Sequence, residues 1–203
     1  MKRASIALAI LAATLAAHNA TAQQSDWLVR ARAVHISPDN GADPISNVGA
    51  ADRVTVSSKT IPEVDFVYFY TPNLAAELVL TYPQKHDVAL DGKNIGSFKH
   101  LPPTLLAQYH FMPGQQFRPY LGAGVNYTRI SSVNLLGGAG SLEHSSVGLA
   151  LQAGLDVAID KNWSVNLDVK KVQIRSDLAI SGTRVSELKI DPVLVGIGLG
   201  YRF

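Results

Sequence analysis

Val193-Leu-Val-Gly-Ile-Gly-Leu-Gly-Tyr-Arg-Phe203, the last eleven residues of the sequence, decides the fold. Alternate residues from Val193 to Phe203 are aliphatic or aromatic, whereas those between them are one leucine, three glycines and Arg202. A strict period of two indicates a β-strand, and an apolar face that ends in aromatics is typical of a strand facing lipid. The three glycines indicate a crowded interior wall on the other face. We therefore predict a transmembrane β-strand here.

Seven further segments alternate in the same way, which gives eight strands in total. The number of strands in such barrels is even, and eight is the smallest closed membrane barrel. The sequence therefore predicts an all-β fold, an eight-stranded antiparallel transmembrane β-barrel with short periplasmic turns and long extracellular loops. The seven segments are Trp27–Ile36, Glu63–Tyr70, Leu74–Thr81, Thr104–Phe111, Pro119–Ile130, Val147–Ile159 and Trp163–Ile174.

The connecting segments alternate in length, as expected when both ends of the barrel chain face the periplasm. Short connectors occupy residues 71–73, 112–118 and 160–162. The alternation of the seventh strand fails at Lys170-Lys171, where we expect either a β-bulge or the lipid boundary. The long connectors, expected as extracellular loops, are Ser37–Thr60, Pro83–Pro103, Ser131–Ser145 and Ser176–Ile190.

The first residues have the parts of a secretory signal peptide, which predicts export. Export together with the eight alternating strands predicts the bacterial outer membrane. Lys2 and Arg3 precede the largely apolar run Ala4–Ala17, and Ala20-Thr21-Ala22 offers a cleavage site. We expect residues 1–22 to be the signal peptide and residues 23–203 the barrel domain. The whole chain has 18 Lys and Arg against 16 Asp and Glu, and the excess lies in the leader, so the mature barrel gives no reason to expect nucleic acid.

Several longer strings are too specific for a generic barrel. They are Trp27-Leu-Val-Arg30, Pro83-Gln-Lys-His-Asp-Val88, Lys99-His-Leu-Pro-Pro-Thr104, Pro119-Tyr-Leu-Gly-Ala-Gly-Val-Asn-Tyr-Thr128, Asn166-Leu-Asp-Val169 and Gly200-Tyr-Arg-Phe203. Together they make the chain resemble the OmpW family of outer-membrane proteins, which includes the AlkL-type alkane-uptake proteins. The resemblance covers essentially the whole mature chain, and the strings that open the fourth strand and form the fifth are the most specific.

The resemblance implies a narrow barrel that passes small hydrophobic molecules across the outer membrane, with a lateral exit through the barrel wall. It also implies that the barrel-assembly machinery reads the end of the chain, so Tyr201 and Phe203 are the candidate assembly signal. Outer-membrane lipid and lipopolysaccharide are the further expected partners of what we expect to be a monomer.

Charged residues at inward positions suggest a polar belt in the lumen. An eight-stranded barrel is just wide enough for side chains to fill it, and buried charges must be paired. Two interpretations stay open: a self-neutralising plug of ion pairs at the periplasmic end, or a selectivity filter. Closure of the barrel by the first and last strands allows Arg30 and Arg202 to be neighbours. The belt consists of Arg30, Arg32, Asp65, Glu77, Asp156, Asp168, Lys170 and Arg202.

Apolar residues at inward positions of the second, third and fourth strands depart from the polar interior of a porin. They are Val67, Phe69, Val79 and Leu106, which we expect to form one patch because their strands are neighbours. The patch is either a locally dry core or the wall of a small hydrophobic binding pocket.

No motif indicates a metal site, a cofactor or catalysis. The sequence has no cysteine, and its histidines show no short-range pair of ligands. His144-Ser145-Ser146 resembles the His-x-Ser string of outer-membrane deacylases, but a Ser–His pair needs an acidic residue to orient the histidine. The following strand offers only Asp156, which faces the lumen rather than lipid. We therefore expect no enzyme.

The sequence leads to two hypotheses for function. The first is passive uptake of small hydrophobic solutes, which would be held in an apolar pocket and released sideways because the charged lumen disfavours them. The second is a sealed structural barrel whose loops bind envelope or host partners. A lumen cavity would favour the first hypothesis, and a fully packed lumen would favour the second.

Overall fold

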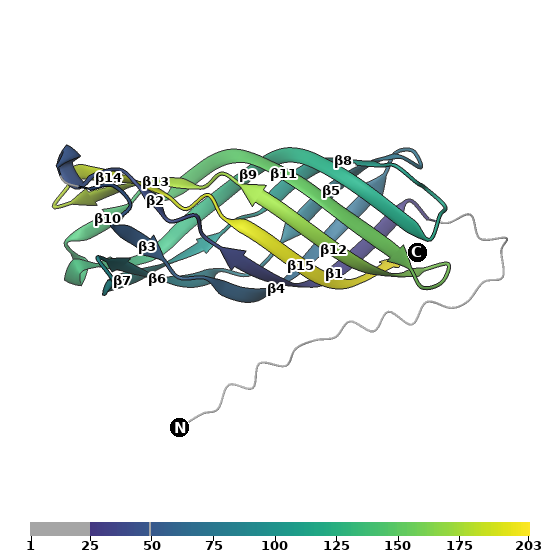
Figure 1. Ribbon diagram of the computed structural model, residues 1–203, viewed down its shortest axis with the longest axis horizontal. Coiled ribbons are helices and arrows are strands. Elements are labelled where there is room, and N and C mark those ends of the chain that lie inside the picture. Colours follow the sequence, from purple (N-terminus) through teal and green to yellow (C-terminus); the bar gives the residue numbers. More distant parts are fainter. Residues whose placement is uncertain (1–24, 49) are drawn as a thin grey trace, which may run out of the picture.

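The computed structural model describes residues 25–48 and 50–203, and the predicted signal peptide lies outside them. Eight strands form a closed antiparallel barrel with its long axis horizontal in Figure 1. The predicted fold is confirmed, with small differences at the strand ends. The eight strands are β1 (Trp27–Ser37), β4 (Lys59–Phe69), β5 (Leu74–Leu80), β8 (Thr104–His110), β9 (Phe117–Leu135), β11 (Ser145–Ala158), β12 (Trp163–Val172) and β15 (Val193–Arg202).

The first and last strands close the barrel. β1 pairs with β15 on one edge, where Arg30 lies opposite Gly200, and with β4 on the other, where Arg30 lies opposite Asp65. The remaining strands pair with their neighbours in chain order. Three short turns and both ends of the barrel chain lie at the same end of the barrel, which we call the turn end.

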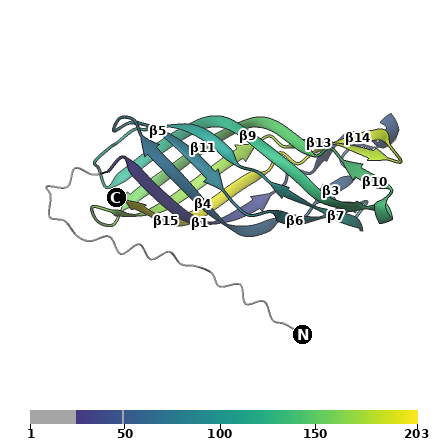
Figure 2. The same ribbon diagram turned by 180° about the vertical axis from the view of Figure 1, so that it is seen from behind.

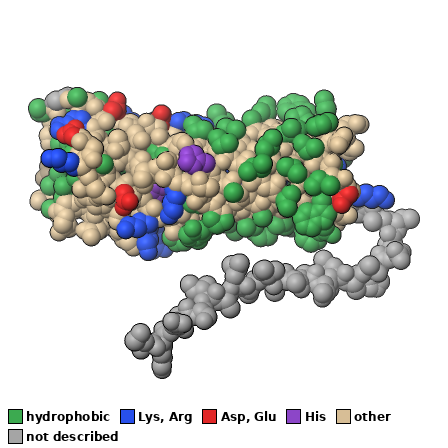
Figure 3. Space-filling model, turned by 60° about the horizontal axis from the view of Figure 1, so that its bottom comes forward, with side chains coloured by type: hydrophobic (Ala, Val, Ile, Leu, Met, Phe, Trp, Pro, Cys, Tyr) green, Lys and Arg blue, Asp and Glu red, His purple; other side chains and the backbone are tan. Residues whose placement is uncertain are grey.

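The outer wall next to the turn end is apolar. Exposed Val, Leu and Ile side chains cover it, and Figure 3 shows them as a broad green band. Aromatic pairs lie near the turn end, with ring centroids 4.9–5.1 Å apart, as expected of an interfacial girdle. The pairs are Trp27–Tyr68, Tyr68–Tyr70, Tyr109–Phe111, Trp163–Tyr201 and Tyr201–Phe203. No helix in the described chain is long and apolar enough to cross a membrane.

Glycines make room on the inner wall, as the sequence predicts. A Cβ on Gly198 would lie 2.0 Å from the carbonyl oxygen of Ala31, and one on Gly154 would lie 2.3 Å from the ring of Tyr120. Real atoms do not approach so closely. Glycine at position 154 therefore lets the large Tyr120 side chain enter the lumen.

The long connectors, expected as extracellular loops, contain strands of their own. They form strands that extend the barrel beyond its apolar band, at the right-hand end of Figure 2. We call this extension, residues 38–48, 50–58, 83–102, 129–145 and 173–191, the upper barrel, and the remainder the lower barrel. Its own elements are β2 (Gly41–Ala42), η1 (Ile45–Asn47), β3 (Val54–Val56), β6 (Gln84–Leu90), β7 (Lys93–Leu101), η2 (Leu136–Gly138), β10 (Gly140–Leu142), β13 (Arg175–Ile180) and β14 (Thr183–Lys189).

The upper barrel has the polarity of a water-soluble sheet. In β6, Lys85 and Asp87 are exposed whereas His86 and Val88 are buried, and Phe98 of β7 is also fully buried. The interior is an apolar cluster that runs down to Val79 and Leu106, and the outer face is polar. In these strands the apolar residues face inward, whereas in the lower barrel they face outward. A search for strands with apolar outer faces therefore misses them.

At Lys170-Lys171 the inward residues of β12 change from charged to apolar. The pairing of β12 with β11 and β15 continues through both lysines without a shift in register, so the expected bulge is wrong and the lipid boundary is the better interpretation. Lys170 is buried in the lumen, and Lys171 is exposed outside. The next inward residue, Val172, is apolar and buried.

Candidate functional site

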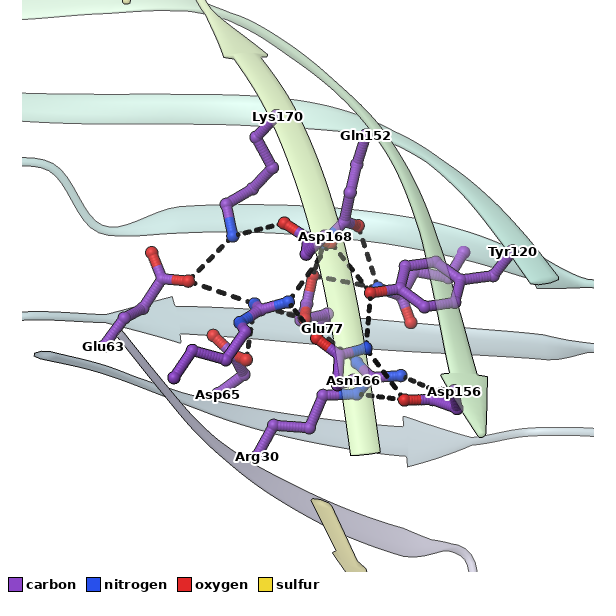
Figure 4. Close-up of polar contacts among 12 residues, drawn as sticks. Arg30, Glu63, Asp65, Glu77, Tyr120, Gln152, Asp156, Asn166, Asp168 and Lys170 are labelled. Atoms are coloured by element: carbon purple, nitrogen blue, oxygen red, sulfur yellow. Dashed lines mark hydrogen bonds and ion pairs between the residues drawn. The ribbon is translucent and has the colours of Figure 1, made fainter. Parts of the chain in front are cut away.

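A buried ion-pair network fills the lumen of the lower barrel (Figure 4). Arg30 donates to both carboxylate oxygens of Asp156, at 3.1 and 2.6 Å, and Arg30 Nη1 donates to Glu77 Oε1 at 3.1 Å. Lys170 Nζ lies 2.8 Å from Glu63 Oε1 and 2.9 Å from Asp168 Oδ1.

Arg32 is the centre of the network. Its guanidinium contacts Glu63 and Asp168 at 3.1 Å and Glu77 at 3.2 Å, and it also pairs with Asp65. The network thus holds three cations, Arg30, Arg32 and Lys170, and five carboxylates, Glu63, Asp65, Glu77, Asp156 and Asp168. Glu63 was not expected there, although it alternates in phase with Asp65.

Neutral donors offset the excess of carboxylates. Glu77 Oε2 accepts hydrogen bonds from Gln108 at 2.9 Å and from Gln152 at 2.7 Å. Asp168 Oδ2 accepts from the hydroxyl of Tyr120 at 2.8 Å, and Asp156 Oδ1 accepts from Asn166 at 2.8 Å. Buried carboxylates with several donors are tolerated, whereas an apolar solute entering here would separate charges from their partners.

Arg202 does not join this network, so it differs from the other predicted members of the belt, although its strand pairs with that of Arg30. Arg202 lies opposite Leu28, one inward position nearer to the turn end than Arg30. Its guanidinium lies 4.1 Å from the ring centroid of Phe69 and donates to the backbone oxygen of Ser25 at 2.9 Å. Arg202 therefore belongs to the mouth of the barrel.

The four predicted apolar residues do not form one patch. Val67 and Phe69 cluster at the turn end with Leu28 and Ala75, whereas Val79 and Leu106 belong to the apolar interior that continues into the upper barrel. The register explains the division, because Asp65 lies opposite Val79 and Val67 lies opposite Glu77. The ion-pair network thus separates the two groups.

A cavity lies directly above the network, and we call it the upper cavity. It is small: about 20 Å³ is open to the centre of a water-sized sphere, which is room for about one water molecule. Lys170 and Glu63 form its charged floor, and its walls are largely apolar. The walls are formed by Ile36, Ile61, Val79, Thr81, His100, Pro102, Thr104, Asn126, Val172, Ile174, Pro192 and Leu194.

Sequence reasoning found Val79 but missed most of this wall. Two of the missed residues lie one inward position above a charged residue on the same strand: Ile61 comes two residues before Glu63, and Val172 comes two residues after Lys170. This switch from charged to apolar inward positions is a signal that could have located the cavity. Leu106 is buried in the same apolar interior but does not line the cavity.

The barrel wall is interrupted beside the upper cavity. The pairing of β5 with β8 ends at Val79 and Thr104, and the pairing of β6 with β7 begins at Gln84 and His100. Within the described chain no backbone pairing joins residues 80–83 to residues 101–103. We call this interruption the seam. Residues on both of its sides, Thr81 and Pro102, line the cavity.

Prolines reduce the number of backbone N–H groups at the seam that need hydrogen-bond partners. Pro83, Pro102 and Pro103 have no backbone N–H that would need a partner. The carbonyl oxygens of Pro102 and Pro103 each accept from Asn126 Nδ2 at 3.2 Å, and that of Pro103 also accepts from the backbone N–H of Tyr127 at 3.1 Å. An open wall in lipid is tolerated only where its backbone groups are satisfied in this way.

His100 lines the cavity, and its ring stacks on that of His86. The rings of His86 and His100 are 4.7 Å apart, and His86 Nδ1 hydrogen-bonds the backbone oxygen of Ser57 at 2.7 Å. Burial, helped by His86 and Lys59, lowers the pKa of His100 to about 3, and burial also lowers the pKa of His86. His86 Nε2, His100 Nδ1 and Gln84 Oε1 have no hydrogen-bond partner in the described chain.

Comparisons with known proteins agree on one class. A family model described as "OmpW family" matches residues 23–203. An outer-membrane protein of Sinorhizobium fredii is 40% identical over 187 residues, which cover 88% of this chain and 80% of that protein. A dibenzothiophene metabolism operon protein of Pseudomonas aeruginosa is 26% identical over 197 residues, 90% of each chain. The crystal structure of the outer-membrane protein OprG from Pseudomonas aeruginosa matches with a TM-score of 0.77 and 30% identity, over 89% of this chain and 97% of that one.

Proposed function

This chain belongs to the OmpW family of outer-membrane barrels, and from that premise we propose that it mediates passive uptake of small hydrophobic molecules across the outer membrane. The solute enters through the upper barrel, widens the small upper cavity by displacing its apolar walls, and leaves sideways through the seam into the bilayer. The observation that carries the proposal is an apolar cavity with a charged floor and an interrupted wall beside it.

The floor argues against an axial route. Below the cavity, a solute would have to part Lys170 from Glu63 and Arg32 from four carboxylates. Uncompensated buried charges cost several kcal/mol each, whereas a solute gains only about 0.8 kcal/mol for each methylene removed from water. The free energy therefore favours a sideways exit.

The wall at the seam is apolar on its lipid side. Leu80, Tyr82 and Leu105 lie on the outer face there, so a solute leaving the cavity passes directly to lipid. No energy source is required, because transfer from water to hydrocarbon is favourable by itself. The relative named for dibenzothiophene metabolism supports a hydrophobic substrate class for the family.

The alternative is a sealed structural or interaction barrel, in which the upper cavity is a packing defect. A substitution that fills the cavity distinguishes the two. Val79→Phe places an aromatic ring in the cavity, and Val169→Phe makes the same change on the outer wall, where Val169 is exposed to lipid.

The experiment measures the initial rate of naphthalene uptake by cells that carry equal amounts of folded barrel, checked by heat-modifiable migration on gels. We expect Val79→Phe to slow uptake several-fold and Val169→Phe to behave as wild type. Equal rates for wild type and Val79→Phe, with both barrels folded, would overturn the proposal in favour of the sealed barrel.

A further inference from the structure

Cations lie at the upper edge of the apolar band on three neighbouring strands. On β9 the exposed Tyr127 is followed outward by the exposed Arg129, and on β7 the exposed Lys99 lies just above Leu101. On the chain that leaves β5, the exposed Tyr82 is followed by Lys85. Figure 3 shows Lys and Arg side chains gathered where the green band ends. This is the height at which the headgroups of an outer leaflet meet the barrel.

The three cations are neighbours on the outer wall. Lys85 lies directly opposite Lys99 in the pairing of β6 with β7, and Arg129 lies opposite Leu101, two residues along from Lys99. Like charges directly opposite each other destabilise a sheet. An anion held between them would remove this repulsion.

No carboxylate of the described chain forms an ion pair with Lys85, Lys99 or Arg129. Asp87, the nearest outward acid on β6, lies two residues further from the lipid than Lys85. Lys171 provides the contrast on β12, since it pairs with Asp39 at 3.3 Å and donates to the backbone oxygen of Asp191 at 2.6 Å.

We propose that Lys85, Lys99 and Arg129 form a binding site for a phosphate group of lipopolysaccharide in the outer leaflet. A phosphate offers three acceptor oxygens and nearly two negative charges, which suits two ammonium groups and one guanidinium. The site would hold a lipopolysaccharide molecule beside Tyr82 and Leu101, next to the seam. It rests on the outer-membrane location and not on the uptake function.

The test is the affinity of the full-length barrel in detergent micelles for purified lipopolysaccharide. Wild type is compared with the triple variant K85Q/K99Q/R129Q and with the matched control Lys171→Gln, after each is shown to be folded by heat-modifiable migration. We expect the triple variant to lose about tenfold or more in affinity, because each cation near an anionic surface contributes independently, and the control to bind as wild type.

Two further arms identify the source of the phosphate and exclude another ligand. Enzymatically dephosphorylated lipopolysaccharide should bind wild type as weakly as the triple variant binds the intact lipid, and millimolar inorganic phosphate should not displace the lipid. Equal binding by wild type and triple variant, or equal binding of intact and dephosphorylated lipid, would overturn the proposal. So would a triple variant that loses binding only to a sulfated polysaccharide such as heparin.

Discussion

The lower and upper barrels are parts of one sheet, but their inner and outer faces have exchanged polarity. In the lower barrel the outer wall is aliphatic and the lumen holds eight charged side chains in one network. In the upper barrel the apolar side chains point inward and the charges point outward. The difference follows from what surrounds each part, because side chains against lipid must be apolar whereas those against water need not be.

The cavity lies where these two interiors meet. Its floor is the top of the charged lumen, and its walls are the bottom of the apolar interior. A hydrophobic solute in the cavity can therefore contact the apolar interior of the upper barrel, but the charged lumen below it blocks further movement toward the turn end. The polarity change also places the cavity at the level of the lipid boundary marked by Lys171.

The largest effect is expected from the removal of Arg32, the centre of the ion-pair network in the lower barrel. Arg32→Met leaves Glu63, Asp65, Glu77 and Asp168 without their shared cation, so we expect a loss of about 3–5 kcal/mol in the free energy of unfolding. Urea unfolding in lipid vesicles measures it. Arg53→Met is the control in the upper barrel, where the exposed pair with Asp91 should contribute nothing measurable. Equal effects of both substitutions would contradict the comparison.

A lysine placed on the outer wall of each barrel in turn tests the difference in polarity between their outer faces. Ile197→Lys puts a charge on the lipid face of β15 and should cost about 2–4 kcal/mol, because lysine near the bilayer midplane is poorly solvated. Asn134→Lys makes the matched change on the exposed outer face of β9 in the upper barrel and should leave the unfolding midpoint in urea unchanged. If Asn134→Lys destabilises as much as Ile197→Lys, the boundary between the two barrels is misplaced.

The smallest expected effect is an acid-dependent loosening confined to the upper barrel. The pKa of His100 is lowered by burial to about 3, below its unfolded value near 6.5, so the unfolded hairpin binds a proton that the folded one does not. Stability contributed by this group is therefore lost as pH falls from about 6.5 toward 3. His86 shifts in the same direction, while Lys59 and Asp87 are the charged neighbours of the pair.

Hydrogen–deuterium exchange of β6 and β7 checks this at pH 7.5 and 5.5, after correction for intrinsic exchange. The open hairpin binds one more proton than the closed one at pH 5.5. We therefore expect the equilibrium constant for opening to increase about tenfold between pH 7.5 and pH 5.5. His100→Gln should reduce the response, whereas replacing the exposed His35 with Gln should leave it intact. A response that survives in His100→Gln would show that other groups control the hairpin.

The eight strands and the inward or outward direction of their residues could be predicted, because alternation reports directly on which face a side chain occupies. The position of each residue along the barrel axis could not be predicted. Val67 and Val79 both point inward, yet Glu77 lies beside Val67 and Asp65 beside Val79, which only the register between β4 and β5 reveals. Arg202 is on the strand that pairs with that of Arg30, as closure of the barrel allows, but only the register shows that it lies one inward position nearer to the turn end.

The strands of the upper barrel were missed for a different physical reason. Membrane strands were sought by their apolar outer faces, and β6 and β7 have theirs inside. The seam was also not located by alternation, since it is an absence of pairing between residues 80–83 and 101–103. The prolines at 83, 102 and 103 are the sequence signal that could have indicated it.

The central claim, sideways release through the seam, is tested most directly by closing it. Thr81 and Pro102 would be partners if the pairing of β5 with β8 continued, and the chain has no other cysteine to interfere. The double variant T81C/P102C is compared with A76C/A107C, which joins the same strands where they are already paired.

The measurement is naphthalene uptake by cells before and after oxidation, and again after reduction, with crosslinking followed by gel mobility. We predict that oxidation of T81C/P102C slows uptake to the level of cells without the barrel, that reduction restores it, and that crosslinked A76C/A107C transports as wild type. Undiminished uptake through a fully crosslinked T81C/P102C barrel would contradict the account.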